Sequence, residues 1–211
     1  MKISKAIATL AIIGMPYTGF ADSNLETRAN IFYDSRTGTP VEIESSKLTE
    51  HESWAHDVIE KSKAIGYALV VDKLARRMDL YFKGSLVDSF FVSLSQERPL
   101  EAKLYEDDGR VPEGIYNVTV KKDIGESKFH RAFMLNYPSR GDWKKFKEAK
   151  KNGIVPREIR RPGRHIEIHG WGDNSDWTDG CIALRDGDID SLFYFVRLGT
   201  PVAIVKTYNR K

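Results

Sequence analysis

The chain contains one cysteine, Cys181, and a histidine, His169, lies twelve residues before it. Gly170 follows the histidine and Gly180 precedes the cysteine. A thiol with its ordinary pKa of about 8.5 is mostly protonated at neutral pH, and an imidazole that takes its proton makes it a much better nucleophile. The spacing therefore predicts nucleophilic catalysis, with Cys181 as the nucleophile and His169 as the general base.

The residues around this pair also favour a catalytic site. Gly180 allows a tight turn and the close approach of a ligand, and the backbone N–H groups of Gly180 and Cys181 are expected to form an oxyanion hole. Trp171 and Trp177 lie between the histidine and the cysteine. We expect these two side chains either to wall the cleft and bind substrate, or to pack within their own loop.

Two other interpretations of these residues stay open. His165, Glu167 and His169 alternate along the chain, so a strand here would place all three on one face. Together with Cys181 they would offer the ligand types that zinc accepts. Alternate residues on a strand converge poorly on one centre, however, and we predict no metal. The other interpretation is that Cys181 is a small, unreactive core residue.

The first residues of the chain predict export. Lys2 and Lys5 precede an apolar stretch at 6–15, and small residues up to Ala21 suit a cleavage site. The apolar stretch is too short for a stable transmembrane anchor, although an uncleaved membrane tether is the alternative. We expect residues 1–21 to be a signal peptide and the mature protein to have no membrane span. An exported protein with one cysteine closes no internal disulfide, so its thiol is buried and inert, forms an intermolecular bond, or is reactive.

The charge of the chain is nearly balanced. Its formal net charge is only +3 although 30% of its residues are charged, which argues against nucleic acid as a partner. Much of the basic charge is local, and we predict that this basic segment borders the cleft. Its members are Lys144, Lys145, Lys147, Lys150, Lys151, Arg157, Arg160, Arg161 and Arg164.

Short β-rich runs with turn residues between them dominate the chain after residue 65. Strands are expected at 67–71, 78–82, 86–94, 116–120, 133–135, 166–168 and 201–205. Helical periodicity predicts helices at 53–64, 142–151 and 189–198, and residues 22–48 resemble an extended arm. The fold class that follows is mainly β, a β-sandwich or partly closed barrel with a few peripheral helices.

These motifs resemble the catalytic domain of the L,D-transpeptidase (YkuD-domain) family. The run His169-Gly170 followed by Thr178-Asp179-Gly180-Cys181-Ile182-Ala183 resembles the family's catalytic signature. The segments Asp108-Gly109-Arg110-Val111-Pro112-Glu113-Gly114-Ile115-Tyr116 and Asn136-Tyr137-Pro138 resemble two further family elements. On this resemblance the chain divides into a signal peptide (1–21), an N-terminal extension with a helix (22–65), a catalytic domain (66–206) and a tail (207–211).

The resemblance implies a β-sandwich or partly closed barrel with Cys181 in a cleft. It also implies attack by Cys181 on the L,D-peptide bond of a peptidoglycan stem peptide, release of D-alanine and a thioester intermediate. His169 matches the family's base, and the carbonyl of Gly170 would orient its ring. No metal or organic cofactor is implied. The expected location is the periplasm or cell-wall space.

Some positions depart from the family pattern. Ala183 stands where many members have an arginine or asparagine. The arginine is thought to help bind the substrate, so in this chain that role is either absent or taken by Arg185. Asp179 stands where many have histidine. The segment 95–103 lacks the usual glycines, although Lys103 matches a family lysine.

The residues leave the fate of the acyl group open. An amine acceptor would make the protein a transferase, and the acceptor would be a second stem peptide, a D-amino acid or a lipoprotein lysine. Water would make it an L,D-carboxypeptidase or a crosslink-cleaving hydrolase. A non-catalytic wall-binding module, and a metal hydrolase that uses His165, His169 and Cys181, are the remaining alternatives. The sequence does not predict an oligomeric state.

Overall fold

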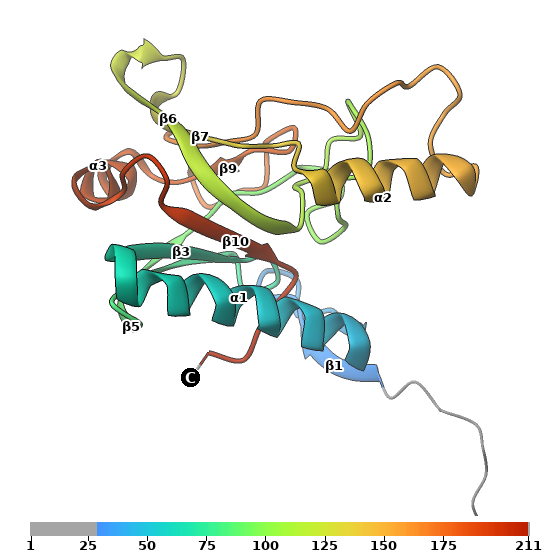
Figure 1. Cartoon of the computed structure of the whole chain (residues 1–211), viewed down its shortest axis with the longest axis horizontal. Coiled ribbons are helices and arrows are strands. Elements are labelled where there is room, and N and C mark those ends of the chain that lie inside the picture. The colour runs from blue at the N-terminus through green and yellow to red at the C-terminus, as the bar shows by residue number, and fades with distance from the viewer. Residues whose placement is uncertain (1–28, 211) are drawn as a thin grey trace, which may run out of the picture.

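Ten strands and three helices form the described part of the chain, residues 29–210 of this computed structural model (Figure 1). The predicted signal peptide lies outside the described residues. The strands are β1 (Ala29–Tyr33), β2 (Pro40–Glu44), β3 (Tyr67–Asp72), β4 (Arg77–Phe82), β5 (Ser85–Phe91), β6 (Gly114–Ser127), β7 (His130–Leu135), β8 (Glu167–His169), β9 (Ile182–Ala183) and β10 (Pro201–Val205). The helices are α1 (Ser45–Ile65), α2 (Arg140–Lys151) and α3 (Asp186–Phe195).

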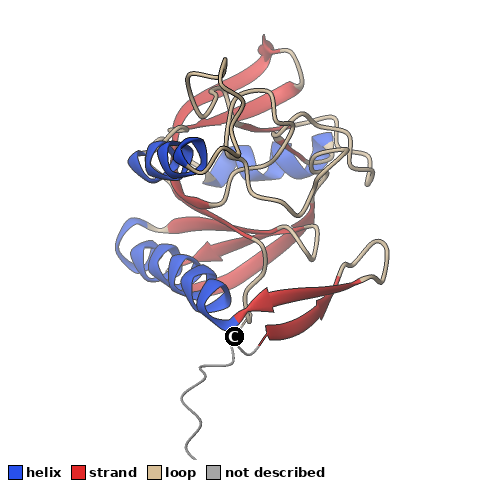
Figure 2. Ribbon diagram, turned by 90° about the vertical axis from the view of Figure 1, so that its right-hand side faces the viewer, coloured by secondary structure: helices blue, strands red, loops and turns tan. Residues whose placement is uncertain are grey.

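Eight strands form one curled sheet in the order β5-β4-β3-β10-β6-β7-β8-β9. β10 runs parallel to β3 and β8 runs parallel to β9, whereas the other neighbours are antiparallel. β1 and β2 form a separate two-stranded ribbon that leads directly into α1 (Figure 2). The predicted mainly β fold with peripheral helices is confirmed.

A backbone bridge between distant segments brings the two ends of the sheet together. The N–H of Ser93 donates to the carbonyl of Ala183 at 2.8 Å, and the N–H of Ala183 donates to the carbonyl of Ser93 at 2.9 Å. Ser93 follows β5 at one end of the sheet, and Ala183 belongs to β9 at the other. The sheet is therefore a partly closed barrel, one of the two forms that the sequence predicts.

The central strands β3 and β10 are buried on both faces. Leu69 of β3 and Ile204 of β10 point into the curl of the sheet, where they join the main core. Val70 and Val205, their neighbours in the chain, point the other way and pack with Val58 of α1. This alternation explains why both strands are continuous apolar runs in the sequence.

The first helix is longer than predicted. α1 begins at Ser45, eight residues before the expected start at residue 53. Its buried positions include Leu48 and His51, which continue the apolar face that Ala55 and Val58 carry. Because His51 is polar, the apolar periodicity in the sequence does not extend to the first two turns of α1. The expected extended arm is also partly wrong, since its described part contains the β1–β2 ribbon and the start of α1.

The other two helices lie close to their predicted positions. Ser139 and Asp142 form a reciprocal capping box at the start of α2, which ends at the predicted Lys151 and is followed by the C-cap Asn152. α3 starts and ends three residues before its predicted range of 189–198, because the backbone becomes extended at Val196. Within residues 29–210, no helix has the length and apolar character needed to cross a membrane.

Candidate active site

The two neighbouring strands β8 and β9 hold the predicted nucleophile and base. Ile168 pairs with Ile182 in parallel register, and both side chains are buried in the core. Cys181 precedes Ile182 and His169 follows Ile168, so both face the opposite side of the sheet. His169 pairs with Ala183, two residues after Cys181.

The turn before Cys181 depends on Thr178 and Gly180. The buried Thr178 hydroxyl donates to the carbonyl of Cys181 at 2.7 Å and accepts from the N–H of Gly180 at 3.4 Å. Gly180 has a φ of +117°, and a Cβ at this position would lie 2.6 Å from the carbonyl oxygen of Arg110. Only glycine fits here without strain. The second hydrogen bond directs the N–H of Gly180, one of the two predicted oxyanion donors, to Thr178.

The thiol of Cys181 is protonated in the resting structure. It donates a hydrogen bond to the carbonyl oxygen of His165 at 3.7 Å, and the side chain is half-buried. Burial raises the pKa of Cys181 to about 11, and the carboxylate of Glu167 acts in the same direction. The ammonium of Lys103 and a backbone hydrogen bond with Glu167 oppose this shift of the pKa.

The imidazole of His169 is buried and held in one tautomer. Its side chain is 1% exposed, and burial lowers its pKa, so the ring is neutral at pH 7. Nδ1 lies 2.7 Å from the carbonyl oxygen of Gly170. A carbonyl only accepts hydrogen bonds, so Nδ1 carries the proton and the lone pair is on Nε2. The ring can therefore act as a base through Nε2.

Aromatic side chains surround this histidine. Phe129, from the turn between β6 and β7, stacks on the imidazole with ring centroids 4.3 Å apart. Trp177 meets the imidazole edge-on at 5.7 Å, and Trp171 meets Phe129 edge-on at 5.4 Å. Phe129 was not predicted from the sequence, because its contact with His169 depends on the β6–β7 hairpin, whose register only the fold reveals. These contacts exclude water from most of the base.

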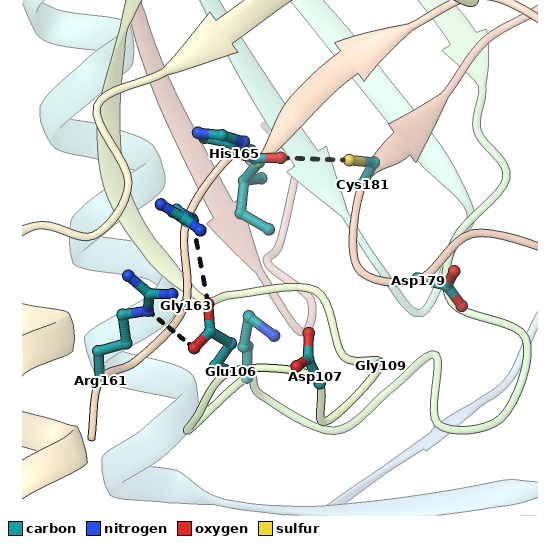
Figure 3. Close-up of a pocket in the computed structure, with 11 residues that line it drawn as sticks. Glu106, Asp107, Gly109, Arg161, Gly163, His165, Asp179 and Cys181 are labelled. Carbon is teal, nitrogen blue, oxygen red and sulfur yellow. Dashed lines mark hydrogen bonds and ion pairs between the residues drawn. The ribbon is translucent and has the colours of Figure 1, made fainter. Parts of the chain in front are cut away.

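Cys181 opens on a cavity of about 650 Å³ (Figure 3). Three cations and three carboxylates line most of it, so its surface is strongly polar. The lining residues are Lys103, Glu106, Asp107, Gly109, Arg161, Gly163, Arg164, His165, Ile166, Asp179 and Cys181.

One wall of the cavity is the segment 101–113, which we call the cavity loop. The buried carboxylate of Asp108 organises this loop: it accepts from the backbone N–H groups of Leu104 and Tyr105 and pairs with the Lys103 ammonium at 2.8 Å. Lys103 therefore extends along the wall in a fixed position. The loop thus presents both a cation and its neighbouring carboxylates to a ligand.

The opposite wall is the segment before β8. Arg161 Nε pairs with Glu106 Oε2 at 2.7 Å, and Arg164 Nε lies 4.0 Å from Glu106 Oε1 (Figure 3). These contacts join this wall to the cavity loop. Of the predicted basic segment, only Arg161 and Arg164 line the cavity. Lys145, on α2, instead lies over the Trp54 ring and donates to the carbonyl of Glu113.

The structure separates the predicted substrate-binding residues. Lys103 lines the cavity, whereas Gly180, Arg185, Trp171 and Trp177 are not among its lining residues. Arg185 is exposed at the start of α3, and both tryptophans lie on the Phe129 side of His169. Their contribution to substrate binding stays a prediction.

The expected shared face of His165, Glu167 and His169 is not formed. β8 begins at Glu167, and His165 precedes it with a left-handed backbone, φ 60°. His165 instead lines the cavity and offers its carbonyl to Cys181. Within residues 29–210, no three His, Cys, Asp or Glu side chains come together in a metal-binding group.

Comparison with known proteins now gives this site a context. Residues 66–204 match the family model of the L,D-transpeptidase catalytic domain (YkuD). The fold is similar to that of Pgp2, a helical cell shape determining protein from Campylobacter jejuni, with a TM-score of 0.51 and 20% identity over 68% of this chain and 49% of that one. Bd1075 from Bdellovibrio bacteriovorus matches with a TM-score of 0.48 and 21% identity, over 68% of this chain and 49% of that one. No curated protein matches the sequence.

The chain spans about half the length of these two solved proteins. At such low identities the similarity to Pgp2 shows the fold alone. The match to the family model rests on the sequence and covers most of the chain.

Proposed function

Because the chain belongs to the family of L,D-transpeptidase catalytic domains, which act on peptidoglycan, we propose that it cleaves the L,D-peptide bond of a stem peptide through Cys181. The observation that carries the proposal is the position of the thiol. Cys181 opens on a polar cavity and shares one face of the β8–β9 pair with a neutral, oriented histidine. Peptidoglycan lies outside the cytoplasm, so the proposed substrate implies that the protein acts there.

The reaction begins with proton transfer from the thiol to Nε2 of His169. The thiolate attacks the carbonyl carbon of the L,D bond, and the tetrahedral oxyanion collapses with loss of the C–N bond. The leaving D-alanine amine takes the proton back from the imidazolium. The peptide remains on Cys181 as a thioester. An acceptor then attacks the thioester and restores the thiol.

The cations in the cavity suit an anionic peptide. A tetrapeptide stem ends in the carboxylate of the D-alanine that leaves, and Lys103, Arg161 and Arg164 line the space in front of the thiol. Lys103 and Arg161 are paired with Asp108 and Glu106 respectively, so Arg164, with an exposed side chain, is the cation best placed to bind a substrate carboxylate.

The proposed acceptor is an amine, which makes the protein a transferase. Thioesters react well with amines and slowly with water, and the aromatic side chains around His169 keep water from the base. A second stem peptide, a D-amino acid or a lipoprotein lysine would supply the amine.

Hydrolysis is the second candidate, and the cavity favours it. Trp171 and Trp177, for which walling the cleft was one of two expected roles, do not line the cavity on which Cys181 opens. Charged side chains line it instead, and they hold water well. The alternative is therefore an L,D-carboxypeptidase or a crosslink-cleaving enzyme.

Product analysis separates the two candidates. The mature protein is incubated with a purified tetrapeptide muropeptide, with and without added D-amino acid or a second stem, and products are identified by mass. New amide products that increase with amine concentration support transfer. If only the shortened stem appears at every amine concentration, the protein is a hydrolase. If no product forms with or without the amine, the proposed function is wrong.

A further inference from the structure

The N-terminal extension, of which residues 29–65 are described, lies outside the family-matched residues 66–204. Its side chains nevertheless contact residues that hold two segments next to Cys181. One is the segment 170–180 between His169 and Cys181, which we call the His–Cys loop. The other is the cavity loop (101–113). Each contact is made by polar side chains that lie far apart in the sequence.

The first contact joins the β1–β2 turn to the His–Cys loop. Arg76 is 2% exposed, and it binds Asp34 of the extension at 3.3 Å and Asp176 of the His–Cys loop at 2.9 Å. Arg36 of the extension also lies 3.6 Å from Asp176. Arg76 binds Oδ2 of Asp176, whereas Oδ1, the oxygen near Arg36, accepts from the N–H of Leu94 at 2.8 Å. Asp176 is therefore fixed from two sides, only two residues before Thr178.

The second contact joins α1 to the cavity loop. His51 is fully buried, and its Nε2 lies 3.3 Å from Glu113 Oε2. The other oxygen of Glu113 pairs with the Lys73 ammonium at 3.0 Å. That ammonium also donates to the carbonyls of Glu101 and Val111, at 2.7 Å and 3.4 Å. One buried cation thus holds both ends of the loop that carries Lys103.

We propose that the N-terminal extension is a working part of the active site, with Asp34 and Arg36 positioning the His–Cys loop and His51 positioning the cavity loop. Neither contact touches the substrate, so these are positioning residues. Without His51, Glu113 keeps only its ion pair with Lys73, and without Asp34, Arg76 keeps only its ion pair with Asp176. Loss of either contact should therefore loosen one loop and leave the other in place.

The two loops serve different parts of the reaction, which makes their effects separable. The kinetic expectation rests on the proposed function, because it needs turnover of a stem peptide. The His–Cys loop leads into the turn that holds Cys181, so Asp34→Asn should lower kcat. The cavity loop carries Lys103 to the cavity surface, so His51→Gln should raise KM. Each effect is expected to be roughly 2- to 30-fold, the range for residues that act through a neighbour.

Amide hydrogen exchange of the full mature protein tests the proposal without any substrate. Asp34→Asn should speed exchange in 170–180 and leave 101–113 unchanged, and His51→Gln should do the reverse. Each variant is therefore the control for the other. Asp57→Asn, an exposed residue of α1, should change neither loop. If His51→Gln or Asp34→Asn does not fold, the exposed Arg36→Gln still tests the first contact through exchange in 170–180.

The outcomes are distinct. Loop-selective exchange together with the split between kcat and KM supports the proposal. The proposal is overturned if the Asp34→Asn and Arg36→Gln proteins fold and exchange amides in 170–180 at the wild-type rate. It is also overturned if the variants lower the thermal unfolding midpoint and change neither loop exchange nor kinetics. If the wild-type protein turns over no stem peptide, the proposed function fails, whereas the exchange measurement still decides this inference.

Discussion

At the scale of single residues, the resting site contains two neutral partners. Burial raises the pKa of the Cys181 thiol and lowers the pKa of the His169 imidazole, so neither group is charged near pH 7. The thiol's hydrogen bond goes to the backbone carbonyl of His165. In the proposed reaction, proton transfer to His169 therefore accompanies substrate binding or attack, in contrast to sites where a thiolate–imidazolium pair exists in advance.

This resting state predicts that the thiol reacts slowly with a small alkylating reagent at neutral pH and faster as the pH rises. Because only the thiolate reacts, the rate should rise about tenfold per pH unit up to about pH 10, without a plateau near 8.5. The pKa of about 11 for Cys181 sets this expectation. Alkylation is followed by mass from pH 6 to 11. The urea-unfolded chain is the control and should give a midpoint near 8.5, and a folded protein with that same midpoint would contradict the prediction.

The two histidines near the thiol should differ in their effects. His169→Ala removes the general base and should slow acylation by about 10²–10⁴-fold. His165 contacts the thiol through its backbone, so His165→Asn keeps the contact and should cost much less. Asparagine suits the left-handed backbone at this position. Single-turnover acylation rates with a stem peptide decide between them, and a larger loss for His165→Asn would mean that the base is wrongly assigned.

At the scale of elements, the turn from Thr178 to Cys181 depends on glycine. In Gly180→Ala the new Cβ would lie 2.6 Å from a carbonyl oxygen at positive φ, which should cost about 1–3 kcal/mol and displace Cys181. Gly187→Ala is the matched control, because nothing lies within 4 Å of its added Cβ. This second change should be neutral or slightly stabilising. Thermal unfolding and acylation rates of both variants are compared, and equal effects would show that the turn tolerates a side chain.

The segment before β8 should contribute charge to substrate binding. Arg164 lines the cavity with an exposed side chain, so Arg164→Glu should weaken binding of an anionic stem peptide and reduce its salt dependence. The change should be about two- to fivefold, as for other exposed charges. Arg160→Glu, at an exposed position that does not line the cavity, is the control. Titrations at low and high salt measure both variants, and equal responses would make Arg164 an ordinary surface charge.

The elements themselves could be predicted where local patterns decide them. Strand alternation predicted the β-rich fold, and helical periodicity predicted α2 to within two residues. The start of α1 was not predicted, because the buried His51 there is polar, contacts Glu113 and does not extend the apolar periodicity. His165 was assigned to a strand face that does not exist, since its left-handed backbone leaves no trace in residue spacing.

At the scale of the whole molecule, the curled sheet brings together segments that the sequence keeps apart. The bridge from Ser93 to Ala183 closes the sheet beside Cys181, and the ion pair of Arg76 with Asp176 joins residues 100 positions apart. The sequence contains no local signal for such pairs. The neighbouring glycines led to Cys181 and His169 as candidate nucleophile and base, which stays a prediction. Of the residues that line the cavity, Lys103, Arg161 and Arg164 were predicted near the cleft, whereas Glu106 and Asp107 were not.

The central claim is that Cys181 forms a covalent thioester with the stem peptide, and intact-protein mass spectrometry tests it most directly. The mature protein is mixed with a tetrapeptide muropeptide, quenched in acid and weighed. We predict an added mass equal to the substrate less D-alanine, located on Cys181 and absent from a folded Cys181→Ala protein. Turnover of the muropeptide by that folded Cys181→Ala protein would contradict the account.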